Sequence, residues 1–471
     1  MKTKIVIFLG VACFFASVLI SGCKKTELST LSGILTFSFT DNSAKSFTFT
    51  VDNIGMTITN KDSLPYQTNI SSLTAQYTAV INNTVKVGTA IQISGSTANN
   101  FTSPVNYICV AQDGVTLKTY VVTVNVSKVD PEAVPWVQKT PTAFGSGYPY
   151  QSYFFLNGKH HIIASNSFAW FVNDPDVKMY QSTDGISWSE LPLDSSFPLG
   201  YSYEVVVNNG KAYMLQFVGA AEVYGAKQPT ILNTVYSSTD GVVWTQSNNL
   251  LPTTALTNNV GVLNNNLYVM GGGTIGAFGA FDGSRPNGST FYPAAAYSDT
   301  TMTSIGGGSW TKTAMLPASA ANRRYTANCV FNNKFYMIGG QDPNGNVLKD
   351  VWSSTDGLTW TQVSNGAFSA RQKASVVAYN NQLWMIGGQD ETGAYLKDIV
   401  ISADNGLTWN VVPADKTLPA AFTPRGNARL YVDANSILWI IGGEQANPED
   451  TDFLAPHAVT DIWTGKLNKL K

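Results

Sequence analysis

Residues 330–340 read VFNNKFYMIGG, and residues 349–360 read KDVWSSTDGLTW. The pattern returns at residues 378–388 as AYNNQLWMIGG and at residues 397–409 as KDIVISADNGLTW. Weaker copies bring the number to six between Trp136 and the C-terminus, with a period of about fifty residues. A double glycine after one strand and a tryptophan in a later strand, repeated at this spacing, predict the blades of an all-β propeller.

Each copy contains four predicted strands, which we call a to d from the axis outward. The predicted d strands begin at Trp136, Trp188, Trp244, Trp310, Trp360 and Trp409. The predicted c strands cover residues 178–182, 234–238, 296–299, 350–354, 398–402 and 461–465. The first d strand has no repeat before it, and the last c strand has no d strand after it. We therefore predict that the segment at Trp136 completes the sixth blade and closes the ring, which removes its exposed sheet edges.

Residues 136–471 resemble a Kelch-type, galactose-oxidase-like six-bladed propeller. The double glycines carry the resemblance, together with the aromatic residues that follow them; they occupy residues 272–273, 339–340, 387–388 and 442–443. The first two copies lack the double glycine and are divergent. The resemblance implies a rigid ring whose function lies in its loops.

The first 22 residues are predicted to be a lipoprotein signal peptide. Lys2 and Lys4 form a basic start, and residues 5–20 form an apolar run of signal-peptide length. This run is short for a helix that spans a bilayer.

Residues 19–23, LISGC, resemble a bacterial lipobox. The resemblance implies cleavage before Cys23, lipid on its sulfur and a lipidated tether over residues 23–30. Two or more acyl chains anchor a protein stably in a membrane. Lys24 after the cysteine, by resemblance to other lipoproteins, favours the outer membrane, with the chain facing the periplasm or the cell surface.

Residues 31–128 are predicted to form an immunoglobulin-like (Ig-like) β-sandwich. Short alternating runs of apolar and polar residues are typical of its strands, and Asp113-Gly114 predicts a turn between two of them. The stretch at residues 101–124 resembles the closing hairpin of Ig-like modules in bacterial surface lipoproteins. Residues 129–135, with two prolines, are the predicted linker to the propeller.

Composition limits the partners. The chain has 471 residues, of which 13% are charged, and its net charge is −2. Nothing in this balance favours a nucleic-acid partner. After loss of the signal peptide and lipidation of Cys23, Cys109 and Cys329 remain; they fall in different predicted domains, so we expect buried thiols without a disulfide.

The segments SxDxGxTW and STDGxxW resemble the Asp-box of sialidases and related propellers. They begin at Ser402 in the longer form and at Ser182, Ser238 and Ser354 in the shorter form. One interpretation is a glycosidase. We favour a structural one, in which the aspartate bonds the backbone of a tight c–d turn, the glycine takes a positive φ and the tryptophan packs between blades. The catalytic residues that a sialidase resemblance implies are not recognisable.

No cofactor or metal site is predicted. The chain has three histidines, His160, His161 and His457, and the first two are strand neighbours that point to opposite faces. Galactose-oxidase-like copper chemistry would need convergent imidazoles. No phosphate-binding glycine loop, nucleophile elbow or zinc-binding helix motif occurs.

Four b–c loops are predicted to be long, at residues 165–177, 217–233, 273–295 and 444–460. Their candidate ligand-binding residues are Phe168, Trp170, Phe171, Tyr224, Phe278 and Phe281. Aromatic residues on such loops suggest stacking platforms for sugar rings or a protein surface. The alternative is that they pack on one another and hold the loops in place.

Arg323, Arg371 and Arg425 occupy matching places just before strand a of the fourth, fifth and sixth copies. Near the mouth of the channel they would hold a carboxylate or a sulfate. The alternative, which the Kelch resemblance implies, is that they hydrogen-bond neighbouring blades.

The leading hypothesis is a cell-envelope lipoprotein whose propeller is a non-catalytic binding module for a glycan or a protein. The first alternative is a metal-independent carbohydrate-active enzyme such as a sugar mutarotase, because some six-bladed Kelch propellers are sialic-acid mutarotases. The second is a structural adhesin that acts through the Ig-like domain alone.

Overall fold

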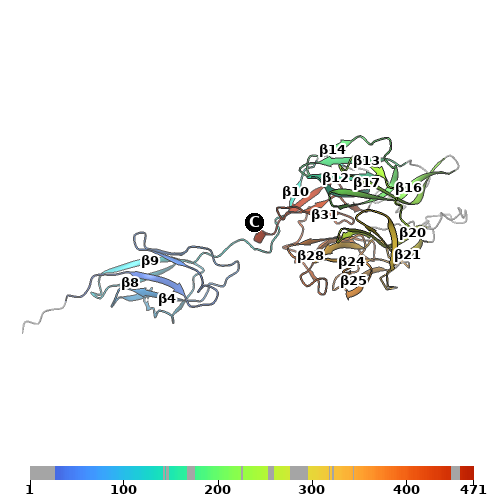
Figure 1. Ribbon diagram of the computed structural model, residues 1–471. Helices are drawn as coiled ribbons and strands as arrows, with labels where there is room; N and C mark the ends of the chain where they lie inside the picture. Colours follow the sequence, from blue (N-terminus) through green and yellow to red (C-terminus); the bar gives the residue numbers. More distant parts are fainter. Residues whose placement is uncertain are drawn as a thin grey trace, which may run out of the picture. The chain divides into compact units, whose positions relative to one another are not determined.

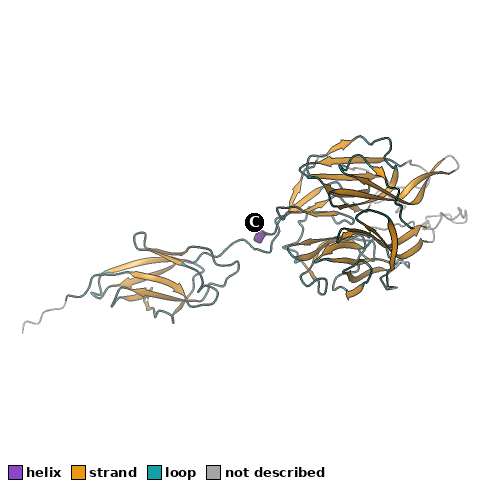
Figure 2. Cartoon of the chain, viewed as in Figure 1, coloured by secondary structure: helices purple, strands orange, loops and turns teal. Residues whose placement is uncertain are grey.

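The computed structural model describes residues 27–141, 144, 148–166, 175–223, 226–252, 259–275, 295–317, 319–320, 323–342, 344–446 and 457–470. Within these ranges the one helical segment is a 3-10 turn at Asn468–Leu470, and all other regular structure is strand (Figure 2). A search of the same ranges finds no helix with the length and apolar character needed to cross a membrane. The chain divides into two compact units, Met1–Pro131 and Glu132–Lys471.

The first unit contains two sheets around one apolar core. The smaller sheet has the order β1-β4-β7 and the larger has the order β2-β3-β9-β8-β5-β6. All pairs are antiparallel except β3 with β9. The strands are β1 (Ile34–Phe39), β2 (Phe49–Asp52), β3 (Thr57–Asn60), β4 (Leu73–Ala79), β5 (Thr84–Val87), β6 (Ala90–Ile91), β7 (Ala98–Asn99), β8 (Val105–Val110) and β9 (Leu117–Thr123).

Alternating side chains fill the core of this unit. Phe37 and Phe39 of β1 are buried in the same core cluster as Tyr107 of β8, while Ser38 between them is half-buried. The ring of Phe37 meets the ring of Tyr107 edge-on, with centroids 5.5 Å apart. The predicted turn is confirmed, because Asp113 Oδ1 accepts from the N–H groups of Val115 and Thr116.

The second unit contains six four-stranded antiparallel sheets, which we number in chain order, and one short two-stranded ribbon. The first sheet is β11 (Tyr150–Leu156), β12 (Lys159–Ser165), β13 (Val177–Ser182), β14 (Ser189–Leu191); the second is β15 (Gly200–Asn208), β16 (Lys211–Val223), β17 (Ala226–Ser238), β18 (Thr245–Gln246); the third is β19 (Val260–Leu263), β20 (Asn266–Ile275), β21 (Ala295–Ile305), β22 (Trp310–Met315). The fourth is β23 (Ala327–Phe331), β24 (Lys334–Gln341), β25 (Val347–Ser354), β26 (Thr361–Ser364); the fifth is β27 (Ser375–Tyr379), β28 (Gln382–Gln389), β29 (Tyr395–Ser402), β30 (Asn410–Val411); the sixth is β31 (Arg429–Val432), β32 (Leu438–Ile441), β35 (Ile462–Gly465), β10 (Val137–Lys139); the ribbon is β33 (Glu444–Gln445) with β34 (His457–Ala458).

The sixth sheet combines the two ends of the unit, as predicted. Its outer strand β10 comes from the start of the unit and pairs antiparallel with β35, near the C-terminus (Figure 1). Val137 lies opposite Thr464, and Gln138 lies opposite Trp463. The backbone groups on one side of β35 are thereby satisfied by a segment more than three hundred residues away in sequence.

Six apolar clusters of described residues join each sheet to the next. The cluster between the first and second sheets contains Phe154, Met179 and Trp244, and similar clusters follow around the unit. The last cluster joins the sixth sheet to the first, since Trp439 and Ile441 pack with Ile162, Ala164, Tyr180 and Trp188. Hydrophobic burial therefore links the six sheets in a cycle.

The Asp-box segments form the predicted c–d turns. Asp184 Oδ1 accepts from the N–H groups of Ile186 and Ser187, and these bonds hold the pKa of Asp184 far below its usual range. Gly185 has φ +71°, and its carbonyl accepts from Trp188 Nε1. The turns at Asp356 and Asp404 repeat this arrangement.

One prediction about the connections was wrong. Residues 217–233 are largely paired strand, because β16 and β17 stay paired as far as Val223 and Ala226. In the connection predicted at residues 273–295, β20 and β21 are paired as far as Ile275 and Ala295, and residues 276–294 lie outside the described residues. Pairing satisfies the backbone N–H and C=O groups that an irregular loop would leave to water.

The end of the predicted linker packs within the second unit, where Val134 is buried and Asn468 N–H donates to the carbonyl of Ala133.

Candidate functional site

The long connections, a buried polar cluster and a pocket all lie at one end of the second unit, which we call the loop end. At this end the innermost strands begin and the second strand of each sheet connects to the third. The connections at residues 342–346 and 390–394 are short turns. The other four connections begin after Ser165, Val223, Ile275 and Gln445, and the first three of these hold the predicted aromatic residues.

Those aromatic residues lie outside the described residues. They are Phe168, Trp170, Phe171, Tyr224, Phe278 and Phe281, and Cys23 also lies outside. The flanking pairs Ser165–Val177 and Ile275–Ala295 place the connections at the loop end. Their role in binding stays a prediction.

The side chains of the three arginines predicted as a candidate anion site are engaged by carboxylates of the chain itself. Their side chains are 1–2% exposed, and each guanidinium holds both oxygens of an aspartate in the same sheet. The pairs are Arg323 with Asp350, Arg371 with Asp398 and Arg425 with Asp461. A guanidinium engaged in this way has little hydrogen-bonding capacity left for a ligand, so the geometry favours the structural alternative.

The arginines join neighbouring sheets through their backbone. The carbonyl of Arg371 accepts from Gly340 N–H of the fourth sheet, and the carbonyl of Arg425 accepts from Gly388 N–H of the fifth, each at 2.9 Å. The side chains bond within their own sheets, where Nη1 of Arg371 donates to the carbonyl of Gly387. The double glycines permit this approach, because a Cβ on Gly387 would lie 2.4 Å from the carbonyl oxygen of Arg425.

A polar cluster lies at the loop end between the fifth and sixth sheets. At its centre is Glu444, which is 2% exposed and accepts from three donors. These are Lys373 Nζ at 2.5 Å, Tyr395 Oη at 2.9 Å and Asn427 Nδ2 at 3.1 Å. Lys373 Nζ also lies 5.3 Å from the centre of the Tyr325 ring. The cluster therefore combines one cation, one anion, hydroxyl groups and an amide.

The backbone holds this cluster in an unusual conformation. Tyr325, Lys373 and Asn427 occupy equivalent positions in successive sheets, with φ of +59°, +58° and +51°. They form a chain of bonds, since Lys373 N–H donates to the carbonyl of Tyr325 and Asn427 N–H donates to the carbonyl of Lys373. A left-handed conformation costs a residue with a side chain about 1–2 kcal/mol.

The pKa values of Lys373, Tyr395 and Tyr150 are all raised above their usual values. Burial acts to lower the pKa of Lys373, but Glu444 and the tyrosines Tyr325 and Tyr395 outweigh it, so the pKa lies above its usual value. Burial raises the pKa of Tyr395, and the Glu444 carboxylate raises it further. Burial raises the pKa of Tyr150, at the start of β11 in the first sheet; Tyr325, Glu444 and Tyr395 raise it further, and Lys373 acts against them. The ammonium and the phenols thus keep their protons at neutral pH.

The cluster arises where the sixth copy departs from the repeat. Gln341 and Gln389 follow the double glycines of the fourth and fifth sheets, and each accepts from the residue after the arginine, Arg324 or Gln372. The sixth copy has Glu444 in place of glutamine and Gly426 in place of that donor. A Cβ on Gly426 would lie 3.0 Å from Lys373 Cβ and 3.1 Å from Tyr395 Cε1, so the glycine makes room for both. Sequence reasoning missed this site, although a comparison of the copies would have shown it.

Residues 287–471 match the DUF6242 beta propeller domain. Residues 23–124 match the domain of unknown function (DUF6242) N-terminal domain, so each unit contains a match to the same family designation. A comparison with curated proteins finds no match. The solved structure titled "Structure of YjhT" is similar, with a TM-score of 0.47 and 14% identity, over 69% of this chain and 95% of that chain. The second unit is a β-propeller domain.

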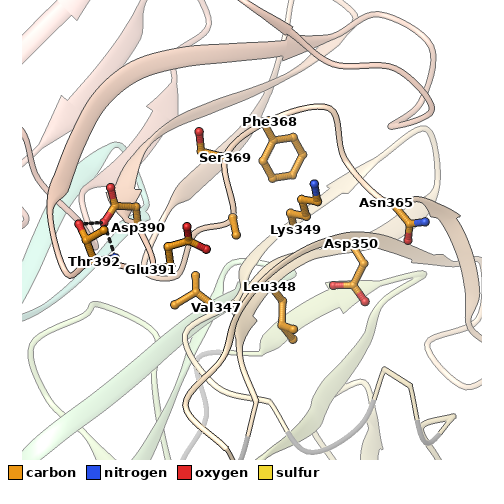
Figure 3. Close-up of a pocket in the computed structure, with 11 residues that line it drawn as sticks. Val347, Leu348, Lys349, Asp350, Asn365, Phe368, Ser369, Asp390, Glu391 and Thr392 are labelled. Atoms are coloured by element: carbon orange, nitrogen blue, oxygen red, sulfur yellow. Dashed lines mark hydrogen bonds between the residues drawn. The ribbon is translucent and has the colours of Figure 1, made fainter.

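A pocket of about 840 Å³ also lies at the loop end, between the fourth and fifth sheets (Figure 3). Lys349, Glu391 and Asn365 line it, together with Asp350 and Asp390. The two aspartates are engaged, Asp350 by an arginine and Asp390 by the turn that follows it. Phe368 is the aromatic residue of this lining and is buried, so the pocket offers hydrogen bonds without a stacking platform.

The histidines do not converge. His160 lies against Trp439 of the sixth sheet and His161 stacks on Phe154, with ring centroids 4.7 Å apart, so the two face opposite sides as predicted. A search of the described residues finds no group of three His, Cys, Asp or Glu side chains that could hold a metal ion.

Burial of His161 predicts a pH-dependent stability. The residue is fully buried, and burial lowers its pKa to about 4, from an ordinary value of 6.5. The unfolded chain takes up a proton below pH 6.5, whereas the folded chain does so only near pH 4, so stability is lost as the pH falls through this window. We expect His161 to account for a loss of about 2 kcal/mol between pH 7.5 and pH 5.

Urea unfolding at the two pH values measures this loss. His161→Gln should reduce the difference between the two free energies of unfolding by about 2 kcal/mol. An unchanged pH dependence in the variant would contradict the assignment.

Proposed function

We propose that this protein is an exported lipoprotein whose propeller binds a glycan at the loop end, without catalysis. The anchor is inferred from the basic start, the apolar run and the lipobox ending at Cys23. The proposed location is the outer membrane, with the propeller facing the periplasm or the cell surface. We also propose that the six sheets are the blades of a six-bladed Kelch-like ring and that the first unit is Ig-like.

The polar cluster around Glu444 carries the glycan proposal. Its one ammonium and one carboxylate neutralise each other, and around them lie the hydroxyl groups of Tyr150, Tyr325 and Tyr395. A neutral polyhydroxylated ligand suits such a surface, since it exchanges hydrogen bonds with hydroxyl, amide and charged groups and stacks on aromatic rings. The aromatic residues of the long connections and the nearby pocket would extend the contact.

Glycan binding is tested with the full mature chain on an array of bacterial and host polysaccharides. We expect binding by the native protein and a loss of about 10- to 100-fold in affinity on Lys373→Met or Tyr395→Phe, as for a lost hydrogen bond to a charged group. Lys159→Met is the matched control, because this exposed lysine lies at the opposite end of the first sheet. Equal binding by all variants, or binding to proteins but not to polysaccharides, would overturn the proposal.

A second candidate function is sugar mutarotation without metal. The observation that favours it is the hydrogen-bonded series Tyr395–Glu444–Lys373, which holds a proton donor, an acceptor and a cation within one site. Exchange NMR of the sugar that binds would decide between the two. Faster interconversion of its anomers, lost in Tyr395→Phe, would favour the enzyme, whereas unchanged interconversion with intact binding would favour the binding module.

A further inference from the structure

Four chain segments meet at one end of the first unit, which we call the tether end. They are the incoming segment, residues 27–33, and three turns at residues 53–56, 80–83 and 111–116. The strand order requires this meeting, because β1 begins where β4 ends, opposite Ala79, and β8 ends where β9 begins, with Val110 opposite Leu117.

Hydrogen bonds fix the incoming segment among the three turns. The carbonyl of Ser29 accepts from Asp113 N–H, and the carbonyl of Leu31 accepts from Asn83 Nδ2 at 2.9 Å. The turn at residues 53–56 is joined through Tyr120, whose hydroxyl bonds Asn53 and also accepts from Ile34 N–H. The tips of the turns therefore surround the place where the chain enters the unit.

Each of these segments presents a large aliphatic side chain to solvent. Ile54 is 95% exposed, Val115 is 80% exposed, Ile81 is 79% exposed and Leu31 is 69% exposed. The three turns contain one charged residue, Asp113, whose carboxylate faces back to the backbone of its own turn. Exposed aliphatic groups gathered in this way mark an interaction surface.

The opposite end of the unit has a different character. Its loops at residues 40–48 and 61–72 contain Asp41, Lys45, Lys61 and Asp62, and their aromatic and leucine side chains are buried or half-buried. The chain leaves the unit at that end, after β9. The exposed aliphatic tips thus distinguish the tether end from the loops at residues 40–48 and 61–72.

We propose that the tether end rests on the lipid bilayer, with the side chains of Leu31, Ile54, Ile81 and Val115 in the interfacial region. The inference rests on the proposed lipidation of Cys23. Ser29 is the sixth residue after Cys23, so even a fully extended chain would hold the acylated cysteine within about 20 Å of Ser29. Acyl chains and aliphatic tips then enter the same leaflet, and the contact orients the unit on the membrane.

The test uses the chain from residue 23 with Cys23→Ser, which cannot be acylated, and vesicles of phosphatidylethanolamine and phosphatidylglycerol. We expect measurable binding in a flotation assay, because the surface acts without the anchor. Ile81→Ser with Val115→Ser should lower the partition coefficient about tenfold or more. Val115→Ser alone has Val129→Ser as its matched control, which removes an aliphatic group that is 57% exposed and follows β9, away from the tether end; the control should leave the coefficient nearly unchanged.

Absence of vesicle binding, or an equal loss in Val115→Ser and Val129→Ser, would overturn the inference. Circular dichroism verifies that the variants fold, as expected for exposed positions. The anchor is tested separately by mass spectrometry of Cys23 in protein purified from membranes. An unmodified Cys23 would refute the anchoring alone, while the vesicle result would still decide whether the surface binds lipid.

Discussion

Replacing Asp350 by alanine should lower the free energy of unfolding of the propeller by about 3–5 kcal/mol. The reason is that Arg323 is 2% exposed and would lose the carboxylate that bonds both of its terminal nitrogens, at 2.7 and 3.0 Å. The same carboxylate accepts from Trp352 Nε1 at 2.6 Å, and that donor would lose its partner too. An unpaired buried charge costs far more than the pair contributes.

Denaturant unfolding followed by tryptophan fluorescence measures this loss in the propeller alone. All 11 tryptophans lie at or after position 136, within the second unit. The double variant Arg323→Met with Asp350→Leu should recover much of the stability, because it removes both charges. Glu190→Ala is the control, since its pair with Lys178 is exposed and should contribute less than about 1 kcal/mol. Losses of equal size in Asp350→Ala and Glu190→Ala would contradict the account.

Gly357→Ala should cost about 2–5 kcal/mol. Gly357 has φ +72°, which costs alanine about 1–2 kcal/mol. In addition, a Cβ there would lie 2.5 Å from Cε1 of Tyr268 in the neighbouring sheet, and overpacking adds about 1–3 kcal/mol. The contact recurs around the ring, as His161 meets Gly241 and Trp439 meets Gly185.

Gly210→Ala separates the two contributions. Its φ is +71°, nearly the same, but nothing lies within 4 Å of its added Cβ. It should therefore show the backbone cost alone when unfolding is measured in the same way. If the two alanine variants lose the same stability, the packing of aromatic residues on the turn glycines is not what holds adjacent sheets together.

The repeat made the strands of the propeller predictable, because each copy contains its own turn and core residues. The Asp-box turns followed from Ser, Asp, Gly and Trp at fixed spacing, and the pairing of β10 with β35 followed from unmatched strands at the two ends. The sequence pattern did not predict that β16 and β17 continue as far as Val223 and Ala226, because backbone pairing there depends on the facing strand and not on a local pattern.

The candidate site was less accessible to sequence reasoning. The arginines stood out because they recur, but recurrence at equivalent positions in a repeat reflects a shared structural task, here the bonds to Asp350, Asp398 and Asp461. The polar cluster depends instead on two residues that differ from those at equivalent positions in the fourth and fifth copies, Glu444 and Gly426. Its donors come from separate segments of the fifth and sixth sheets that only folding brings together, so spacing along the chain gave no indication of it.

We propose that the sheets form a closed ring, which would join Tyr150 of the first sheet to the cluster between the fifth and sixth. Cysteine cross-linking tests it in the Cys23→Ser chain with Val137→Cys and Thr464→Cys, which face each other across β10 and β35. Cys109 is fully buried, and burial raises the pKa of Cys329 to about 12, so neither should compete. We predict a disulfide in this pair and none in Lys139→Cys with Thr464→Cys, which is two residues out of register. Free thiols at positions 137 and 464 in the folded, oxidised protein would contradict the closed ring.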